Sequence, residues 1–311
     1  MKRAVVTGAS GFIGRYLCKL LLSDGWIVYG IGTNIKKLKS LNFNDISFPV
    51  VTFFPVVADF SEYGHLEKLI DINEIDVFFH FAWEGGFTSA LKDYKLQFRN
   101  AESSVEALKS AIQLKCKKFI FAGTVNEIEI NQFINSEKYI PRNTCIYASA
   151  KVAADMMCRT IANEYDVHYC SCLIPLPYGI GNDSKQLINI LIKNCYEGVP
   201  TKLIKGDNMY DIAYIEDIVE AIYKISLLGR NMRAYYIGHR KLKTFKELVT
   251  EIRDIVNPSA ELLFGEYNDT LNMDYKYTDL EALYLDTGFE CKANLKETII
   301  QQAEWLKSIG F

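Results

Sequence analysis

The amino-acid sequence predicts an α/β fold, a doubly wound parallel sheet with a smaller C-terminal α/β lobe. Through the first half, short apolar runs alternate with amphipathic stretches of helical period. This alternation is typical of crossover units, which build a parallel sheet buried on both faces. A glycine-rich turn joins the first apolar run to the first amphipathic stretch. The alternation loosens in the second half, which indicates a separate, smaller lobe.

The apolar runs of the first half are predicted to be strands, and the segments between them supply the crossover helices. The strands cover residues 3–8, 26–32, 50–59, 75–82 and 117–123. The helices cover residues 12–25, 65–72, about 90–114 and about 147–165. A further strand is predicted over 167–179, before the lobe stretches 183–200, 201–207 and 295–311. No repeat or Pro/Gly-rich linker separates the two parts, so we expect them to share an interface.

Composition and charge exclude several classes of protein. The chain has 311 residues, of which 49% are hydrophobic and 23% charged, the balance of a globular protein. A formal net charge of -3 argues against a nucleic-acid binder or a general binder of anionic surfaces. Eight cysteines occur without a CxxC pair, and four histidines form no cluster, so we expect reduced thiols, no metal site and a cytoplasmic location. The N-terminal apolar run is too short for a signal peptide or a membrane span, which predicts a soluble protein.

Residues 4–14, AVVTGASGFIG, run from the first predicted strand into the first predicted helix. Gly8 allows a tight turn, Gly11 lets the backbone approach a pyrophosphate, and Gly14 permits close packing of the helix on the sheet. The helix N-terminus then faces the anion, as in a Rossmann dinucleotide site. The alternative is a glycine-bearing turn without a ligand, and the position between strand and helix favours the cofactor.

The segment YASAK places Tyr147 four residues before Lys151, so that both side chains lie on one face of a helix. The ammonium group and the positive charge of a nicotinamide would lower the pKa of the tyrosine, which could then exchange a proton with a carbinol or carbonyl oxygen. Thr124 ends the strand KKFIFAGT, and its hydroxyl could hydrogen-bond the same oxygen. Alternatively, the pair is a half-buried helix face and Thr124 starts a turn.

Six features in this order and at these intervals, TGASGFIG, Asp59, HFAW, Asn100, FIFAGT and YASAK, resemble the extended short-chain dehydrogenase/reductase family, the NAD-dependent epimerases and dehydratases that act on nucleotide sugars. The resemblance spans nearly the whole chain. It implies that Tyr147 is the general acid/base, that Thr124 orients and polarises the substrate oxygen, and that Lys151 lowers the tyrosine pKa and holds the nicotinamide ribose. It also implies that Asn100 supports this geometry, and that the chain is a homodimer through the helices containing Asn100 and Tyr147.

The same resemblance implies the remaining site residues. Asp59 and Phe60 would flank the adenine, and Ala82 would line the cofactor groove. Trp83 and Glu84 should reach the nicotinamide or sugar edge, or Trp83 packs on the end of the sheet. The predicted cofactor-binding residues are Gly8, Ser10, Gly11, Phe12, Ile13, Gly14, Gly32, Thr33, Asn34, Asp59, Phe60, Phe81, Ala82, Trp83, Tyr147, Lys151 and Pro175. The predicted substrate-binding residues are Trp83, Glu84, Thr124, Asn126, Tyr178, Lys205 and Tyr210. His80 is assigned to the strand interior.

The resemblance also divides the chain. Residues 1–172 and about 212–240 form the dinucleotide-binding domain, and residues 173–211 and 241–311 form the nucleotide-sugar-binding lobe. In this lobe Leu173 and Leu176 stand where Arg and Asn are common, and Tyr210 stands where many epimerases have Arg. The pair Tyr210 and Asp211, followed by Asp217, is similar to the pattern found in a branch of four-keto-sugar reductases and related epimerases. Candidate replacement cations for the diphosphate are Lys185, Lys202, Lys205 and Arg240.

Departures from the family pattern narrow the reaction. Dehydratases of the family carry Asp-Glu directly after the catalytic threonine, where this chain has Val125 and Asn126. Glu127 lies one position late. Epimerases that act at carbons 3 and 5 use a cysteine after the catalytic hydroxyl, and no cysteine occurs between 117 and 144. Both reactions are therefore disfavoured.

The end of the second strand indicates the cofactor. NAD-preferring members have Asp or Glu there, whose carboxylate binds the ribose hydroxyls and repels a 2′-phosphate. Gly32 occupies that place, Thr33 and Asn34 offer donors, and Lys36 or Lys37 offers a positive charge. We therefore expect NADP(H) in preference to NAD(H), unless the lysines merely open a solvated helix.

A net reductase consumes hydride at each turnover, whereas an epimerase regenerates its NAD. The sequence therefore predicts an NADPH-dependent reductase of a nucleotide-linked 4-keto-6-deoxysugar, with hydride passing to carbon 4 and the proton coming from Tyr147. The alternatives are a nucleotide-sugar 4-epimerase that retains NAD and a non-catalytic cofactor-binding scaffold.

Overall fold

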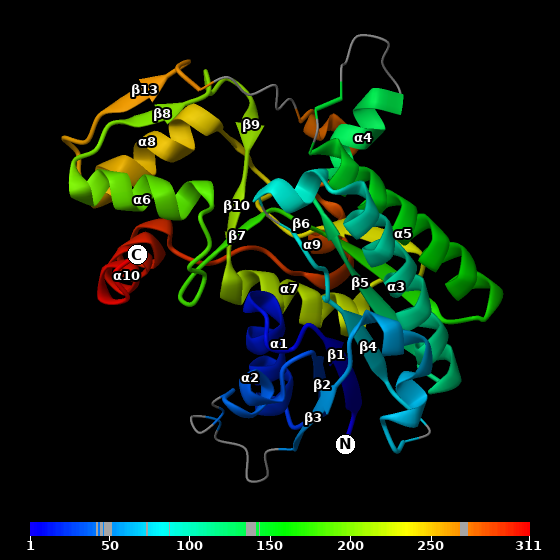
Figure 1. Cartoon of the computed structure of the whole chain (residues 1–311). Helices are drawn as coiled ribbons and strands as arrows, with labels where there is room; N and C mark the ends of the chain where they lie inside the picture. The colour runs from blue at the N-terminus through cyan, green and yellow to red at the C-terminus, as the bar shows by residue number, and fades with distance from the viewer. Residues whose placement is uncertain are drawn as a thin grey trace.

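The computed structural model describes residues 1–41, 43, 46, 52–72, 74–86, 88–134, 141–142, 144–267 and 273–311. At its centre lies a seven-stranded sheet in the order β11-β6-β5-β4-β1-β2-β3, in which every pair of neighbours is parallel (Figure 1). The strands are β1 (Arg3–Thr7), β2 (Ile27–Gly32), β3 (Phe53–Val57), β4 (Val77–His80), β5 (Lys118–Thr124), β6 (His168–Ile174) and β11 (Arg233–Tyr236). The predicted doubly wound α/β fold is confirmed.

Both faces of the sheet are covered by helices, which explains why its strands are apolar without alternation. On β1, Ala4 and Val6 belong to the core under α1 (Phe12–Ser23) and α7 (Ile215–Leu228), whereas Val5 belongs to the core on the opposite face. That second core lies under α3 (Tyr94–Gln113), α5 (Cys145–Glu164) and the 3-10 helix η1 (Phe60–Lys68). The helices α3 and α5 pack side by side (Figure 1).

The strand order reverses at β1, which has β2 on one side and β4 on the other. Because all strands are parallel, their carboxyl ends meet at one edge of the sheet, and the chain leaves β1 and β4 in opposite directions there. This edge brings together Thr7, Gly32, His80 and Thr124, the last residues of β1, β2, β4 and β5. The candidate site is built on the loops that follow them.

Within the described residues, three helices and three short two-stranded sheets form most of the smaller lobe. The helices are α6 (Leu187–Glu197), α8 (Phe245–Val256) and α10 (Leu295–Ser308), and α8 packs against the other two (Figure 1). The strand pairs are β7 (Leu176–Tyr178) with β10 (Ile212–Tyr214), β9 (Met209–Tyr210) with β12 (Lys243–Thr244), and β8 (Thr201–Leu203) with β13 (Leu262–Phe264). One hydrophobic cluster contains residues of α1 and α7 as well as of α6, α8 and α10, so the two parts share an interface as expected.

Three predicted elements differ in their details. The predicted strand 167–179 is divided at Pro175 into β6 and β7, because proline has no N–H group for a ladder. The predicted helix 65–72 is replaced by the 3-10 helix η1, which begins five residues earlier at Phe60. The predicted strand 50–59 begins at Phe53, and residues 50 and 51 lie outside the described part of the chain. The sequence pattern sets no bounds for α7, α8 or the strands after β8. It also does not predict the short elements α2 (Ile35–Lys39), η2 (Thr88–Lys92), α4 (Glu127–Ile134), η3 (Tyr275–Tyr277) and α9 (Ala282–Thr287).

Within the described residues, no helix combines the length and the apolar character that a membrane crossing requires.

Candidate active site

The glycine turn after β1 has the backbone geometry of an anion cradle. Gly8 has φ +69°, a conformation that side-chain-bearing residues rarely adopt. A Cβ atom on Gly14 would lie 2.1 Å from the Gly8 carbonyl oxygen, so only glycine fits there. Glycine is therefore required at position 14 by a contact with the turn itself. The sequence predicts a different reason, the close packing of the helix on the sheet. Helix α1 begins after Gly11, which supplies no side-chain cap, so the first N–H groups of the helix remain free for an anion. The residues fit a dinucleotide pyrophosphate.

The residues predicted to read the ribose lie at the end of β2. Gly32 is not required sterically, because an added Cβ would meet the Ser10 hydroxyl and Leu38 at 3.4 Å, an ordinary contact. Asn34 caps α2 by accepting the Lys37 N–H at 3.1 Å, so its carbonyl oxygen is engaged while its amide stays available. Thr33, Lys36 and Lys37 are exposed. A 2′-phosphate could approach all of these groups.

Asp59 and Phe60, predicted to flank the adenine, begin η1. The Asp59 carboxylate caps this helix by accepting from the Ser61 N–H at 2.7 Å and the Ser61 hydroxyl at 2.6 Å. The Glu62 carboxylate accepts the Asp59 N–H in return, which completes a capping box. Asp59 therefore has a local structural role that the resemblance did not indicate.

The three predicted catalytic side chains meet at the carboxyl end of β5. Thr124 ends the strand, and its hydroxyl lies close to the phenol of Tyr147, which projects from the first turn of α5. Lys151, one helical turn later, is 4% exposed, and its ammonium group donates to the Ala122 carbonyl at 2.6 Å. The sequence spacing alone placed the tyrosine and the lysine on one face. Tertiary packing adds the threonine.

The electrostatics of Tyr147 differ from the sequence-based expectation. We expected the Lys151 ammonium to lower the tyrosine pKa, but burial is the largest influence and raises it above its ordinary value. The hydrogen bond from Thr124 opposes this rise, and the carboxylate of Glu127 adds to it. Burial also lowers the pKa of Lys151, to about 7. The spacing of YASAK could not reveal how completely the protein removes this pair from water.

Trp83 packs between the predicted catalytic residues and α3. Its ring contacts the Tyr147 ring edge-on at a centroid separation of 5.9 Å, and the Lys151 ammonium lies 3.7 Å from its centroid. The indole N–H donates to the side-chain oxygen of buried Gln97 at 2.8 Å. Trp83 thus packs at the end of the sheet, directly on Tyr147 and Lys151.

Asn100 holds the loop that carries Trp83. Its side chain accepts the Glu84 N–H at 2.9 Å and donates to the Glu84 carbonyl at 2.8 Å. The Glu84 carboxylate forms an ion pair with Arg99 on the surface. Asn100 therefore supports the site through the loop backbone. His80 lies in the strand interior as predicted, between the hydroxyls of Thr7 and Ser104 at 3.0 Å each.

Glu127 is a buried carboxyl that the sequence did not assign to the site. It is 6% exposed at the start of α4, and its Oε1 accepts the Thr124 N–H at 2.7 Å. Burial raises its pKa above the ordinary value and the nearby Asp155 carboxylate adds to this rise, whereas the charge of Lys151 opposes it. From the sequence, Glu127 is only a carboxyl group that lies one position after the place of the dehydratase Asp-Glu pair. Its contact with the backbone of Thr124 follows from the turn between β5 and α4, which was not predicted.

The remaining predicted residues at this edge occupy varied positions. Phe12, Ile13, Phe81 and Ala82 are half-buried, and Pro175 is buried between β6 and β7. The Asn126 N–H faces the Thr124 hydroxyl at 3.4 Å.

The lobe contributes a small pocket of about 100 Å³, lined by both apolar and polar side chains. It brings together Tyr178 and Tyr210, two predicted substrate residues, with three basic residues that the sequence did not single out: His239, Lys241 and Lys243. Tyr178 is itself buried, with its hydroxyl hydrogen-bonded to the Thr298 hydroxyl at 2.7 Å.

The predicted replacement cations do not gather at this pocket. Arg240 pairs with Glu281 and Glu290, and Lys202 lies 3.5 Å from the Glu266 carboxylate. Lys205 is exposed and does not line the pocket, and neither does Lys185.

Asp211 organises the basic side of the pocket. Its carboxylate accepts the Tyr236 hydroxyl at 2.5 Å, the His239 N–H at 2.9 Å and the His239 ring at 2.8 Å. The contact with the ring raises the pKa of His239, so the imidazolium persists to higher pH than usual. Gly238 is required beside it, because a Cβ there would lie 2.1 Å from Asp211 Oδ2.

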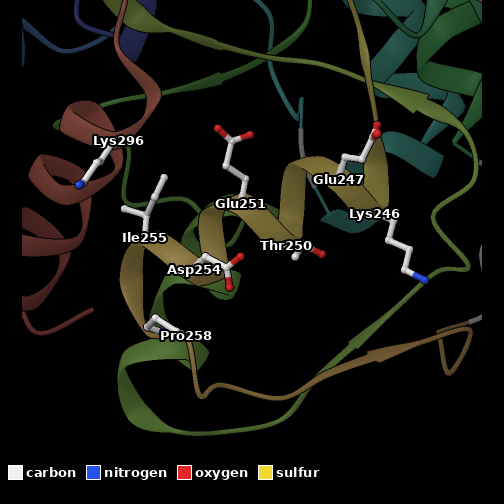
Figure 2. Close-up of a pocket in the computed structure, with 8 residues that line it drawn as sticks. All are labelled: Lys246, Glu247, Thr250, Glu251, Asp254, Ile255, Pro258 and Lys296. Carbon is white, nitrogen blue, oxygen red and sulfur yellow. The ribbon is translucent and has the colours of Figure 1, made fainter.

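A larger surface hollow of about 900 Å³ lies on the lobe, over α8 and α10. Figure 2 shows its side chains spread along α8, with Lys296 on α10. Its charged residues are of both signs, the carboxylates of Glu247, Glu251 and Asp254 and the ammonium groups of Lys246 and Lys296, and no predicted site residue lines it.

Comparison with known sequences agrees with this geometry. The sequence profile of the NAD dependent epimerase/dehydratase family matches residues 4–238, which include the glycine turn, the Thr124–Tyr147–Lys151 set and Asp211. The chain belongs to this family. The predicted resemblance is therefore confirmed, and the chain is an enzyme of an NAD(P)-dependent family.

Two relatives and one solved structure share less than a quarter of their residues with this chain. It is 23% identical over 302 residues to the CDP-abequose synthase of Yersinia pseudotuberculosis, covering 96% of this chain and 98% of that protein. It is 22% identical over 330 residues to the human dTDP-D-glucose 4,6-dehydratase, covering 98% and 90%. Among solved structures, the UDP-glucose 4-epimerase of Thermotoga maritima with UDP-glucose has a TM-score of 0.75 at 20% identity, covering 99% of this chain and 100% of that one. This last likeness shows a shared fold.

Proposed function

We propose that this enzyme is an NADPH-dependent reductase of a nucleotide-linked 4-keto-6-deoxysugar. The observation that carries the proposal is the convergence of Thr124, Tyr147 and Lys151 at the edge of the sheet where the glycine cradle also lies. Val125 and Asn126 replace the acid and base that a 4,6-dehydratase uses to eliminate water. The similarity to a CDP-abequose synthase supports a reductase.

The side chains suit proton donation to a carbonyl oxygen. Bound NADPH would supply a hydride to carbon 4 of the sugar. Tyr147 gives its phenolic proton to the oxygen as the C=O bond becomes C–OH, and the Thr124 hydroxyl orients the same oxygen. Because burial raises the pKa of Tyr147, the phenol stays protonated at neutral pH and is ready to donate. The ammonium of Lys151 then stabilises the phenolate that remains.

The preference for NADP(H) rests on the end of β2. An acidic residue there would repel a 2′-phosphate, and Gly32 has none. Thr33 and the Asn34 amide are exposed beside Lys36 and Lys37, so donors and positive charge lie where the phosphate would sit. A Cβ atom would fit at position 32, so packing does not explain why this residue is glycine.

We further propose that the lobe pocket takes an anionic group of the nucleotide sugar. Its volume of about 100 Å³ is too small for a whole nucleotide sugar but suits one phosphate. The two carboxylates of the pocket are already engaged, Asp211 by His239 and Asp217 by the backbone N–H groups of Lys292 and Ala293. Because His239 uses Nδ1 on Asp211, its Nε2 and the Lys241 ammonium are the donors offered to a ligand.

A nucleotide-sugar 4-epimerase with retained NAD is the second candidate, favoured by the likeness to the epimerase from Thermotoga maritima. The supernatant of the denatured, purified protein would then contain stoichiometric NAD in its ultraviolet spectrum. A non-catalytic scaffold is a third candidate, and the complete set of Thr124, Tyr147 and Lys151 argues against it.

We also propose a homodimer through α3 and α5, a cytoplasmic location and the domain boundaries predicted from the sequence. The outer faces of the two helices expose Tyr94, Phe98, Met156 and Met157, which a second copy would cover. The charge-introducing Phe98→Asp variant should give monomers in sedimentation, and an unchanged sedimentation coefficient would contradict the dimer.

The deciding experiment is a screen of nucleotide 4-keto-6-deoxysugars (dTDP, CDP, GDP and UDP) with NADPH and NADH, followed at the nicotinamide absorbance. We expect oxidation of NADPH with one of these substrates. Oxidation of NADH alone would overturn the cofactor assignment, and no oxidation with any substrate would overturn the reductase assignment.

A further inference from the structure

The backbone at the end of β5 leaves two polar groups that no strand satisfies. The Val125 N–H donates to the Ile174 carbonyl of β6 at 3.0 Å, so it points toward that strand. Backbone groups alternate along a strand, and Ala122 and Thr124 therefore direct theirs to the opposite side. On that side β4 has already ended, because its last residue, His80, pairs with Phe121. The Ala122 carbonyl and the Thr124 N–H extend beyond it.

Two buried, oppositely charged side chains take the place of the missing strand. Lys151 of α5 donates to the Ala122 carbonyl at 2.6 Å, and Glu127 of α4 accepts the Thr124 N–H at 2.7 Å. Gly123 makes room between them, since a Cβ there would lie 2.6 Å from Glu127 Oε1. Both side chains are nearly inaccessible, with exposures of 4% and 6%. Each therefore needs a counter-charge.

The other charged groups around them are accounted for. The Asp155 carboxylate binds Arg159 at 2.9 Å and the Tyr169 hydroxyl at 2.9 Å. His80 and Cys158 stay neutral, because burial lowers the pKa of the histidine to about 3 and raises that of the thiol. Glu127 has only a neutral N–H as its hydrogen-bond partner among the described contacts.

We propose that Glu127 is a positioning residue of this enzyme, whose carboxylate fixes the backbone of Thr124 and supplies the counter-charge that keeps the Lys151 ammonium protonated. The inference rests on the proposed reductase function for its catalytic consequence. Without the carboxylate, the buried lysine loses its proton at lower pH, and the charge that stabilises the Tyr147 phenolate is lost. The pKa of Lys151, about 7, is already held up by Glu127 against the effect of burial.

The Glu127→Gln variant tests the charge, because glutamine has the same size and its oxygen can still accept the Thr124 N–H. We expect the fall of kcat at high pH to move to lower pH by about one unit, since neighbouring opposite charges shift a pKa by about 1–3 units. At pH near 8 this lowers kcat about tenfold, with KM for the sugar changed less than about threefold. Glu127→Asp keeps the charge but is too short for the same hydrogen bond, so it should lower kcat without moving the pH limb.

Glu129→Gln is the matched control, because Glu129 lies on the same helix and is paired with Arg142 at 2.9 Å instead of Lys151. Its pH profile should match that of the unmodified protein.

A readout independent of activity is the titration of ¹³C-labelled lysine by NMR, with Lys151 assigned from the Lys151→Arg variant. Glu127→Gln should lower the pKa of Lys151, and an unchanged pKa would overturn the inference. A lowered pKa in a protein that reduces no tested sugar would overturn the proposed function and leave this inference standing.

Discussion

The edge of the sheet and the lobe pocket hold charged ligands in different ways. At the edge, the cradle is made of backbone: Gly8, Gly11 and Gly14 shape the turn, and the free N–H groups of α1 face the anion. In the lobe, the contacts come from side chains of separate segments, among them Tyr210 before β10 and His239 after β11. A backbone site can be recognised from glycine spacing, whereas a side-chain site depends on which segments the fold brings together.

The largest expected effect comes from replacing a tyrosine by phenylalanine. Made once in each region, this substitution distinguishes a residue of the chemical step from a residue that binds the substrate. Tyr147→Phe should lower kcat by about 10²–10⁴-fold, because it removes the proton donor and leaves the ring packed on Trp83. Tyr210→Phe in the lobe should change KM for the sugar and leave kcat within about threefold, since it lies outside the reacting atoms. Steady-state NADPH oxidation measures both. Retention of a tenth of the activity by Tyr147→Phe would contradict the assignment of the tyrosine.

The backbone character of the cradle can be tested with two glycines. Gly14→Ala should lower the free energy of unfolding by about 1–3 kcal/mol and weaken cofactor binding, because its Cβ would meet the Gly8 carbonyl at 2.1 Å. Gly32→Ala should leave stability nearly unchanged, as its Cβ makes only ordinary contacts at 3.4 Å. Denaturant unfolding and fluorescence titration with NADPH give the comparison. Equal losses in the two variants would show that the cradle is not shaped as described.

Gly32→Asp should reverse the cofactor preference. The new carboxylate would repel a 2′-phosphate and bind the ribose hydroxyls, so the ratio of kcat/KM for NADPH to that for NADH should fall by about ten- to a hundredfold, about 1.4–2.8 kcal/mol. The Cβ atom of the new side chain makes only ordinary contacts at this position. If the unmodified protein already prefers NADH, Gly32 does not determine the cofactor.

The smallest expected effect concerns the lobe. His239→Ala should raise KM for the nucleotide sugar about tenfold, as expected for the loss of one charge-assisted hydrogen bond. Because Asp211 raises the pKa of His239, its positive charge is present below that raised pKa and is lost as the pH rises through it. KM of the unmodified protein should therefore increase toward high pH, and KM of His239→Ala should not. Lys205→Ala, which removes an exposed charge outside the pocket, serves as the control.

Several features of the site could not be predicted because they depend on burial. The spacing of Tyr147 and Lys151 gave their shared helix face, but it could not show that burial raises the pKa of the tyrosine. The sequence indicates Glu127 only as a carboxyl group one position later than the Asp-Glu pair of the dehydratases. Its contact with Thr124 depends on the β5–α4 turn, which shows no periodic pattern.

The sequence by itself determined the doubly wound sheet, the glycine cradle, the family and the Thr124–Tyr147–Lys151 set, because periodicity, glycine spacing and short motifs are local properties of the chain. The tertiary structure decided which charges are buried and which segments converge. It placed Glu127 and Lys151 on neighbouring backbone groups at the end of β5, joined His239 to Asp211, and engaged Arg240 with surface carboxylates. Solvent exclusion and long-range contacts set these pairings, and neither is a property of any single segment.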